Sequence, residues 1–428
     1  MTCHADIEDR DQSISFPKIG TTAKDTATGN HTGHLAETMT IQDEVQFENL
    51  IPGKEYTMSG VLMIRDDESV LRSHGAEVRA EKTFIPDSSN GTVTIDFIID
   101  STSIAGRTVT AFEELKYNGI LLAVHADIND EGQSVDFPKV WTTAKDVETG
   151  NHLGHLSETT EIQDEVFYTN LIPGKEYTVS GLLMVRSEGT ALIQNEHEIR
   201  AEKTFIPEDR SGSVILSFTV DSTLLCGQTI VAFEDLIYNG VVIASHADIE
   251  DEEQSVHFPA AHTQACDEKK GGNVLTFGEG TVVIDTVLYE NLIPGQTYTV
   301  KGVLMDRETG EATEITGEAE FVPETENGEA DVRFTLDVTA EMMNKSFVVF
   351  EEIYDENGIL VAEHKDINDE AQTVNVVIGT ADVPKPNPRR SETPILGIEK
   401  NFTVVFIVLA ASILLTLGAA VLIRKKRG

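Results

Sequence analysis

Within this chain apolar and polar residues alternate with the period of a strand, and no long segment repeats at helical spacing. In Thr92-Val-Thr-Ile-Asp-Phe every second side chain is apolar, and β-branched residues are frequent. Asn118-Gly119, Asn239-Gly240 and Asn357-Gly358 stand between such runs, and Asn-Gly is the strongest short signal for a β-hairpin. Strands at intervals of roughly ten residues, with turns between them, predict an all-β chain of Ig-like antiparallel β-sandwich domains.

The pattern repeats along the chain. Phe-Pro, then Asn-Leu-Ile-Pro-Gly and a Tyr, then the string His-x-Asp-Ile-x-Asp-x-x-Gln recur in the same order. The copies begin at Phe16, Phe137 and Phe258, and their final strings are His125–Gln133, His246–Gln254 and His364–Gln372. We therefore expect tandem repeats at 16–136, 137–257 and 258–378.

The two ends differ from the repeats. A further copy of the string, His4–Gln12, precedes the first Phe-Pro, so residues 1–15 are predicted to be the last strand of an upstream repeat in a longer protein. Residues 402–423 are uncharged and apolar, and a basic tail at 424–428 follows them. This predicts a transmembrane helix with a cytoplasmic tail, and an extracellular N-terminal part. Residues 379–401, with Pro384, Pro386 and Pro388, are predicted to be an extended linker.

The charge and the cysteines exclude some classes of protein. A net charge of −41 argues against nucleic-acid binding, which needs clustered Lys and Arg, and suits an exposed ectodomain. Cys3, Cys226 and Cys266 fall at unrelated places in the repeats, so no disulfide framework is expected.

The repeats themselves show which reactive side chains are kept. The first strand reads Thr-Thr-Ala, Thr-Thr-Ala and Thr-Gln-Ala, so only its first Thr is held. Each copy keeps one Thr, one Asp, one Glu, one His and one Gln. They are Thr21, Asp43, Glu113, His125 and Gln133; Thr142, Asp164, Glu234, His246 and Gln254; and Thr263, Asp285, Glu351, His364 and Gln372.

This set suits the joining of a hydroxyl to an amide. A Thr hydroxyl needs a neighbouring base, for which His is the usual choice, and carboxylates can orient that base or share a proton. The Gln side chain offers an acyl carbon within the protein itself. Attack by the Thr oxygen would expel ammonia and leave an ester between the first strand and the last.

The chain resembles the Thr–Gln ester-bond domains, or VaFE repeats, of Gram-positive surface adhesins. The resemblance covers 16–378 and depends on the Thr-Thr-Ala or Thr-Gln-Ala opening, the strand around Phe112-Glu113, and the His-to-Gln string. It implies autocatalytic esters with His as base and an acidic pair as helpers. The implied bonds are Thr21–Gln133, Thr142–Gln254 and Thr263–Gln372, whereas His4 and Gln12 lack a Thr and are expected to stay unreacted.

The choice of helping carboxylate stays open. Glu114, Asp235 and Glu352 are kept as well. A two-residue turn at Asn118-Gly119 places Phe112 opposite His125, whereas a three-residue bulged loop places Glu113 there. The third copy has one extra residue, so a two-residue turn pairs Glu351 with His364. That copy also differs before its Thr, where Ala260-Ala261-His262 replaces Lys18-Ile19-Gly20.

Other chemistries fit less well. A Lys–Asn isopeptide would use Lys18 and Lys139, but Ala260 stands in the third copy. Asp127–Gly132 resembles the opening of an EF-hand, yet Pro138 occupies the place of the bidentate Glu. His31-x-x-His34 and His152-x-x-His155 have no counterpart in the third copy. No metal or cofactor site is therefore expected. One alternative to the cross-linked repeats is an ectodomain without cross-links that is rigidified by Ca²⁺ or binds a ligand. A further alternative is a hydrolase that uses Thr, His and Asp.

The expected function is structural. The chain is predicted to be a membrane- or wall-anchored cell-surface stalk of an adhesin, with single-turnover ester formation rather than enzymatic turnover. Its expected partners are the membrane and the ligand of a head that precedes the repeats. Thr393-Pro-Ile-Leu-Gly397 matches a sortase motif at Pro and Gly but not at Leu and Thr, which leaves attachment to peptidoglycan open.

Overall fold

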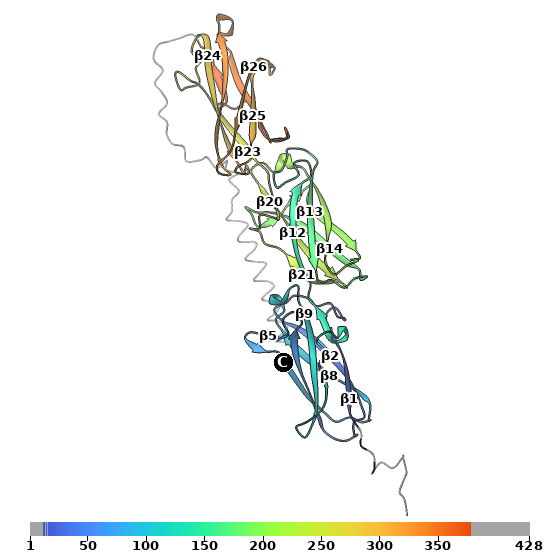
Figure 1. Ribbon diagram of the computed structural model, residues 1–428. Helices are drawn as coiled ribbons and strands as arrows, with labels where there is room; N and C mark the ends of the chain where they lie inside the picture. The colour runs from blue at the N-terminus through green and yellow to red at the C-terminus, as the bar shows by residue number, and fades with distance from the viewer. Residues whose placement is uncertain (1–11, 13, 15, 378–428) are drawn as a thin grey trace, which may run out of the picture. The chain divides into compact units, whose positions relative to one another are not determined.

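The computed structural model describes residues 12, 14 and 16–377, which fold as antiparallel β-sheets (Figure 1). Short 3-10 turns are the other regular elements of this part: η2 (Thr102–Ile104), η3 (Glu131–Gln133), η4 (Ser222–Leu224) and η5 (Ala340–Met342). Each repeat contains one three-stranded sheet and one larger sheet. The all-β fold predicted from the alternation is therefore confirmed.

The first repeat shows the arrangement. Its smaller sheet has the order β1 (Lys18–Asp25), β2 (Met39–Glu48), β8 (Gly91–Ile99). Its larger sheet contains β3 (Tyr56–Ile64), β4 (Ser69–Val70), β7 (Arg79–Phe84), β9 (Thr108–Tyr117), β10 (Ile120–His125) and β11 (Ser134–Asp136). A small pair, β5 (Arg72–Ser73) and β6 (Ala76–Glu77), stands apart from both. The first strand and the last strand of the repeat thus belong to different sheets.

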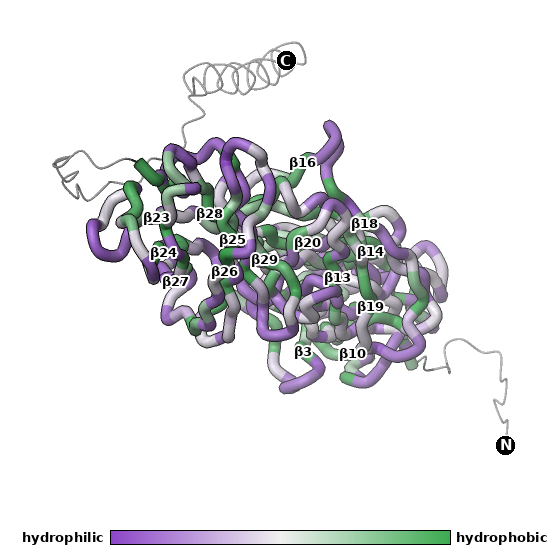
Figure 2. The backbone as a smooth tube through the Cα atoms, turned by 90° about the horizontal axis from the view of Figure 1, so that it is seen from above, coloured by the Kyte–Doolittle hydropathy of each residue, from purple (hydrophilic) through white to green (hydrophobic). Residues whose placement is uncertain are grey.

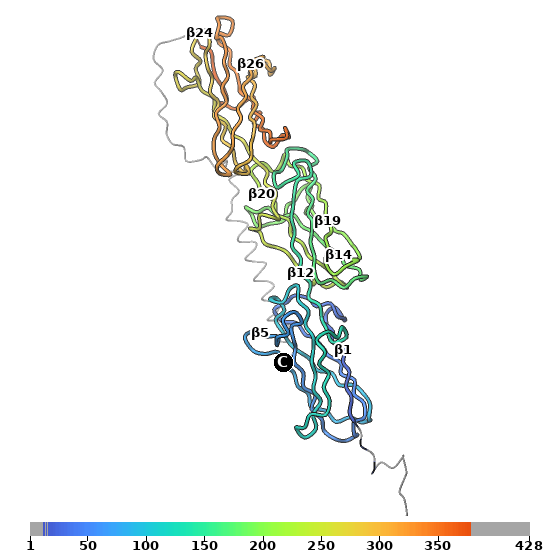
Figure 3. Tube along the Cα trace, viewed as in Figure 1, coloured from blue at the N-terminus to red at the C-terminus, as the bar shows by residue number. Residues whose placement is uncertain are grey.

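The other repeats follow the same plan, as the traces of Figure 3 show. In the second repeat the smaller sheet is β12 (Lys139–Asp146), β13 (Thr160–Thr169) and β19 (Gly212–Val220). The larger sheet is β14 (Tyr177–Val185), β15 (Thr190–Ala191), β18 (Arg200–Phe205), β20 (Thr229–Tyr238), β21 (Val241–His246) and β22 (Ser255–His257), with β16 (Ile193–Gln194) and β17 (His197–Glu198) as a separate pair.

In the third repeat the smaller sheet is β23 (Ala260–Asp267), β24 (Gly278–Glu290) and β27 (Gly328–Val338). The larger one is β25 (Tyr298–Asp306), β26 (Ala312–Phe321), β28 (Ser346–Tyr354), β29 (Leu360–His364) and β30 (Thr373–Asn375).

Each core lies between the two sheets of its repeat, because the longer strands of both sheets, such as β2 and β8, bury every second side chain. In β2 the inward residues Met39, Ile41, Val45 and Phe47 are buried. Figure 2 shows hydrophobic residues along the strands and largely hydrophilic loops. Burial of this apolar surface is the main term that stabilises such a sandwich.

The Asn-Leu-Ile-Pro-Gly motif is a structural turn. The backbone N–H of Ile51 donates to the hydroxyl of buried Tyr56 at 3.0 Å, and the other two repeats make the same bond at 3.1 Å. Asn49 has a φ of 63°, which Asn tolerates better than most residues. The Asn and the Tyr that recur in every repeat are thus explained by their role in forming this turn, and they need no role in a reaction.

The hairpins settle the register that the sequence left open. Asn118 and Gly119 form a two-residue turn with φ values of 48° and 77°, but a bulge between Leu121 and Ala123 then places His125 opposite Glu113. In the third repeat the structure does not have the two-residue turn that the sequence left open. There Asp355 N donates to Ile359 O across a longer loop, and the pairing of Glu351 with His364 arises with a bulge of its own.

Among the residues that the structure describes, no helix is long and apolar enough to cross a membrane. The helix predicted at 402–423, the linker at 379–401 and the tail at 424–428 lie outside those residues, as does most of 1–15.

Candidate functional site

The candidate site of each repeat lies where the first strand of the smaller sheet approaches the end of the larger sheet. In repeat 2 the backbone N–H of Ala144 in β12 donates to the carbonyl of Glu253, the residue before Gln254, at 2.7 Å. In repeat 3 Ala265 donates to Ala371, the residue before Gln372, at 2.9 Å. The strand that carries the Thr is therefore hydrogen-bonded to the turn that carries the Gln.

Two carboxyl groups face each other in the interior. Asp43 stands in β2 between buried Ile41 and Val45, and Glu113 stands in β9 between buried Ala111 and Leu115. Both carboxyl groups are 0% exposed. An acidic residue at an inward strand position costs folding free energy unless its charge is removed or paired.

Burial and mutual repulsion let this pair of carboxyl groups keep one shared proton at neutral pH. Desolvation raises the pKa of Asp43 to about 6, against the opposing effect of its hydrogen bonding with Glu113. Desolvation, and then the charge of Asp43, raise the pKa of Glu113 to about 10. Two adjacent carboxyls in a dry site hold a shared proton in this way. At neutral pH Glu113 is therefore a proton donor.

The same arrangement recurs in the other repeats. Desolvation raises the pKa of Asp164 to about 6, and it also raises the pKa of Asp285. It raises the pKa values of Glu234 and Glu351 well above the usual range.

The glutamine amide is fixed by this carboxyl pair. Gln133 lies in η3, just before the last strand rather than within it, and is 0% exposed. Its Nε2 donates to Glu113 Oε2 at 2.8 Å and to the His125 carbonyl at 3.4 Å. Gln254 and Gln372 make the matching bonds to Glu234 and Glu351 at 3.0 and 3.1 Å. The three amide oxygens are buried and have no hydrogen-bond partner among the described residues.

The threonine hydroxyl lies in the same place. In repeat 3, Glu351 Oε2 accepts hydrogen bonds from Thr263 Oγ1 at 3.3 Å and from Gln372 Nε2 at 3.1 Å. The hydroxyls of Thr21 and Thr142 are also buried and have no hydrogen-bond partner in the described part of the chain. The Thr oxygen and the Gln amide thus meet at one carboxyl.

The histidine presents one nitrogen to the interior and the other to the loop. The Nδ1 atoms of His125, His246 and His364 are buried and lack a hydrogen-bond partner among the described residues. Desolvation lowers the pKa values of His246 and His364, so these imidazoles are neutral at pH 7. A neutral imidazole can accept the hydroxyl proton.

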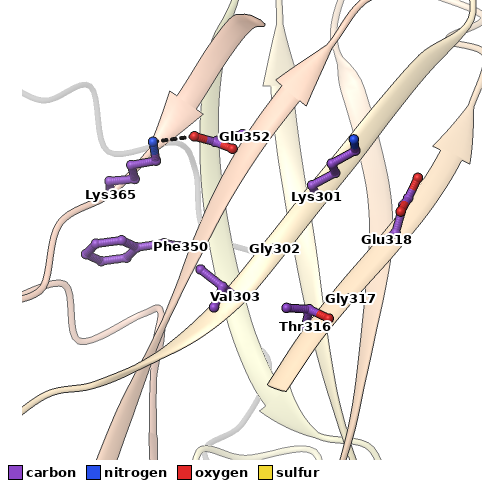
Figure 4. Close-up of a pocket in the computed structure, with 9 residues that line it drawn as sticks. All are labelled: Lys301, Gly302, Val303, Thr316, Gly317, Glu318, Phe350, Glu352 and Lys365. Carbon is purple, nitrogen blue, oxygen red and sulfur yellow. Dashed lines mark hydrogen bonds and ion pairs between the residues drawn. The ribbon is translucent and has the colours of Figure 1, made fainter. Parts of the chain in front are cut away.

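The structure distinguishes the helping carboxylate from its neighbour. Figure 4 shows Glu352 bound to Lys365, and both residues line a hollow together with residues of β25 and β26 such as Lys301 and Val303. None of the five site residues of repeat 3 lines that hollow. In the other repeats Glu114 pairs with Lys116, and Asp235 accepts from Ser245. The inward residues are therefore Glu113, Glu234 and Glu351.

One acidic residue of each string was not singled out by the sequence analysis. Asp130, Asp251 and Asp369 each place a carboxylate oxygen 3.3 to 3.4 Å from Nε2 of the site histidine. Each of these acids stands three residues before the Gln in its copy, and this constant spacing could have identified them as site residues from the sequence.

The weaker motifs have structural roles. His34 Nδ1 bonds the buried Asp25 at 2.6 Å, and His31 Nδ1 lies 2.9 Å from the Ser134 carbonyl. Within residues 12, 14 and 16–377 no group of His, Cys, Asp and Glu is arranged to hold a metal ion. Cys226 and Cys266 form no disulfide.

Known structures resemble the chain weakly. A *Mobiluncus mulieris* adhesin with disulfide, isopeptide and ester cross-links is 13% identical, with a TM-score of 0.26, over 61% of this chain and 88% of that one. The C-terminal domain of *Streptococcus agalactiae* BspA is 9% identical, with a TM-score of 0.29, over 53% and 96%. Three domains of the bacteriophage RB49 Hoc protein are 9% identical, with a TM-score of 0.29, over 85% and 100%. No curated protein matches, and these likenesses are too weak to carry an argument.

The family relationship is clear from the sequence of each repeat. The model of the T-Q ester bond containing domain matches residues 17–137, 138–258 and 259–376 in succession. These matches cover most of the chain and include all fifteen candidate residues. The chain therefore belongs to the family of T-Q ester bond containing domains.

Proposed function

We propose that each repeat forms an intramolecular Thr–Gln ester without help from another protein, and that the chain is a structural stalk at the cell surface. The bonds are Thr21–Gln133, Thr142–Gln254 and Thr263–Gln372. The observation that carries the proposal is the shared carboxyl oxygen of Glu351, which accepts from both the nucleophile and the amide that it attacks.

The described residues supply each step of the reaction. Neutral His364 takes the proton of Thr263 at Nδ1, and Oγ1 attacks Cδ of Gln372. Negative charge develops on the amide oxygen. Protonated Glu351 then donates to Nε2, the C–N bond breaks and ammonia leaves. The proton on the imidazole returns to the carboxyl pair, so hydroxyl and amide become ester and ammonia in balance. Because the nucleophile and the acyl group are consumed, each site acts once.

A dry site protects the product. The Gln side chains are 0% exposed, and Thr142 and Thr263 are 3% and 4% exposed. Water that could hydrolyse the ester is therefore kept from the acyl carbon, much as enzymes exclude water from reactive intermediates.

The position of the bond suits a stalk. It joins the first strand, in the smaller sheet, to the turn just before the last strand, which belongs to the larger sheet, at the points where the chain enters and leaves the repeat. In the chain-entropy model a link that closes roughly a hundred residues stabilises by about 4 to 5 kcal/mol. Surface anchoring by the predicted helix at 402–423, and wall attachment at Thr393–Gly397, belong to this proposal and lie outside the described residues.

Intact mass of the full chain tests the ester proposal. We expect the mass to fall by one ammonia for each bond, three in all, and peptide mapping to join each Thr peptide to its Gln peptide. A matched control is Thr143→Ala, which removes a hydroxyl one position along the same strand and should leave all three bonds. A full, uncondensed mass in the folded protein would contradict the proposal and favour an ectodomain without cross-links.

A further inference from the structure

The loop that carries the Gln also carries an acid aimed at the histidine. His125 Nε2 lies 3.3 Å from Asp130 Oδ2, His246 Nε2 lies 3.3 Å from Asp251 Oδ2, and His364 Nε2 lies 3.4 Å from Asp369 Oδ2. The three copies agree although the residues between the His and the Asp differ, for example Asn129 against Glu250. A contact that survives this divergence points to a shared role.

Each of these acids uses its two oxygens differently. Asp251 Oδ1 accepts the backbone N–H of Glu253 at 2.9 Å, while Oδ2 faces His246. Asp130 does the same with Gly132 N at 2.8 Å and His125. The carboxylate therefore links the turn that presents the Gln to the ring that serves as base.

The contact also determines which nitrogen carries the ring proton. A neutral imidazole has one N–H, and a carboxylate beside Nε2 stabilises the form with hydrogen on Nε2. Nδ1 is then an acceptor, and Nδ1 is the nitrogen that is buried in the site. The same carboxylate stabilises the imidazolium after it takes the Thr proton, as the third member of a catalytic triad does.

We propose that Asp130, Asp251 and Asp369 are positioning residues that hold the site histidine with its hydrogen on Nε2, so that Nδ1 can accept the Thr proton. This inference rests on the proposed ester formation and adds a sixth residue to the five already assigned to each site. It makes each site a relay from Thr through His to Asp, alongside the separate pair of buried carboxyls.

Asp251→Asn is a selective test, because Asn keeps the Oδ1 acceptor for the turn and replaces Oδ2 with an N–H donor. That donor favours the form of His246 with hydrogen on Nδ1, which cannot accept the proton of Thr142. Asp248→Asn is the matched control, since Asp248 bonds the Glu250 N–H on the same loop and is not among the residues beside Nε2.

The rate is measured on the full chain, made by cell-free synthesis, captured in guanidinium, diluted to fold and quenched at timed intervals for peptide mass. We expect Asp251→Asn to slow the bond of repeat 2 by roughly 100-fold, the low end for a positioned proton-transfer group. Asp251→Glu should recover part of the rate, and Asp248→Asn should keep nearly the parent rate at pH 7, where His246 is already neutral. Repeats 1 and 3 of the same molecule are internal controls.

The pH profile separates positioning from a purely structural role. Desolvation lowers the pKa of His246, the charges of Asp251 and Asp248 partly oppose this, and Lys139 from β12 lowers the pKa further. Glu234 lies opposite His246 on β20. Removing the Asp251 charge should therefore move the acid limb of the rate profile to lower pH. A slower reaction with an unmoved acid limb would mean that the residue only holds the turn, and would overturn the inference.

A second readout reports the ring directly. In a Thr142→Ala chain, which cannot react in repeat 2, ¹⁵N shifts of His246 should show hydrogen on Nε2, and adding Asp251→Asn should move it to Nδ1. Hydrogen on Nδ1 in Thr142→Ala, or an undiminished rate in Asp251→Asn, would overturn the inference. Absence of bonds in repeats 1 and 3 of the Asp251→Asn chain would instead refute ester formation itself.

Discussion

Thr142→Val isolates the contribution of the cross-link in the middle repeat. Val has nearly the shape of Thr, and Thr142 Oγ1 has no hydrogen-bond partner among the described residues. In the unreacted site the substitution mainly changes the surroundings of Asp164 and Glu234, whose pKa values the Thr142 hydroxyl lowers against the larger effect of desolvation. What it removes is the nucleophile, and with it the bond to Gln254.

The expected loss follows from the loop that the bond closes. Residues 142 and 254 are separated by roughly a hundred residues, for which the chain-entropy model gives about 4 to 5 kcal/mol. At about 3 to 5 °C per kcal/mol for a domain of this size, the melting temperature of repeat 2 should fall by roughly 12 to 25 °C. The change of hydroxyl to methyl itself should stay within about 1 kcal/mol.

Calorimetry of the full chain, with peptide mass on the same sample, measures both quantities. Thr142→Ser keeps a hydroxyl and should keep the bond and most of the stability. Thr143→Val, on the outward side of the strand, should change neither. An unchanged mass in Thr142→Val would identify a different nucleophile, and a restored ammonia with a shift below about 5 °C would refute the entropic reasoning.

Three further outcomes follow from the same structure. In a Thr21→Val chain the site of repeat 1 stays unreacted, and burial raises the pKa values of Asp43 and Glu113 from 3.8 and 4.5 to about 6 and about 10. At this pair the folded repeat binds more protons than the unfolded one, so the contribution of the pair to stability is greatest below about pH 4 and falls as pH rises, by about 1.4 kcal/mol per pH unit for each proton. Denaturant titrations from pH 5 to 8 should show this fall in the free energy of unfolding, and Glu113→Gln in the same chain should remove most of the fall. A free energy of unfolding that does not change with pH in the Thr21→Val chain would contradict the shared proton. Alkaline hydroxylamine should leave the links of the folded parent chain intact but cleave all three links after the chain is unfolded, which mass spectrometry can show. Links that persist in the unfolded chain would be amides rather than esters. Gly181→Ala should destabilise repeat 2 by about 1 to 3 kcal/mol in calorimetry without loss of its ester bond, because a Cβ there would lie 2.6 Å from Phe218 Cζ. Unchanged stability would show that the Phe218 ring can shift without loss of stability.

The sequence allowed much of the fold to be predicted because burial acts on alternate residues. Strands such as β8 follow directly from the alternation at Thr92–Phe97. The buried Asp43 was visible in the same way, as an acid at an inward position between Ile41 and Val45. Such a break in an apolar face is costly, so its repetition in every copy indicates chemistry.

The remaining features depend on pairings between distant residues. The bulge after Leu121 brings Glu113 opposite His125, and no local pattern distinguishes it from a longer turn. The third repeat reaches the pairing of Glu351 and His364 through a different loop, where Asn357-Gly358 misled the turn assignment. The contact of Asp130 with His125 Nε2 is likewise set by the 3-10 turn, which holds Gln133 outside the strand that was expected to contain it.

The spacing of the three bonds has a mechanical consequence for the proposed stalk. With Thr21 joined to Gln133, the covalent path runs from the first strand directly to the turn before β11, and residues 22–132 lie outside it. From Gln133 the chain continues through Phe137 to Thr142, where the next bond begins, and it does the same from Gln254 to Thr263. Without the bond, unfolding one repeat would release more than a hundred residues, or on the order of 350 Å of extended chain. With all bonds formed, tension passes through short segments and side-chain esters, so the length of the stalk no longer depends on the hydrogen bonds within its sheets.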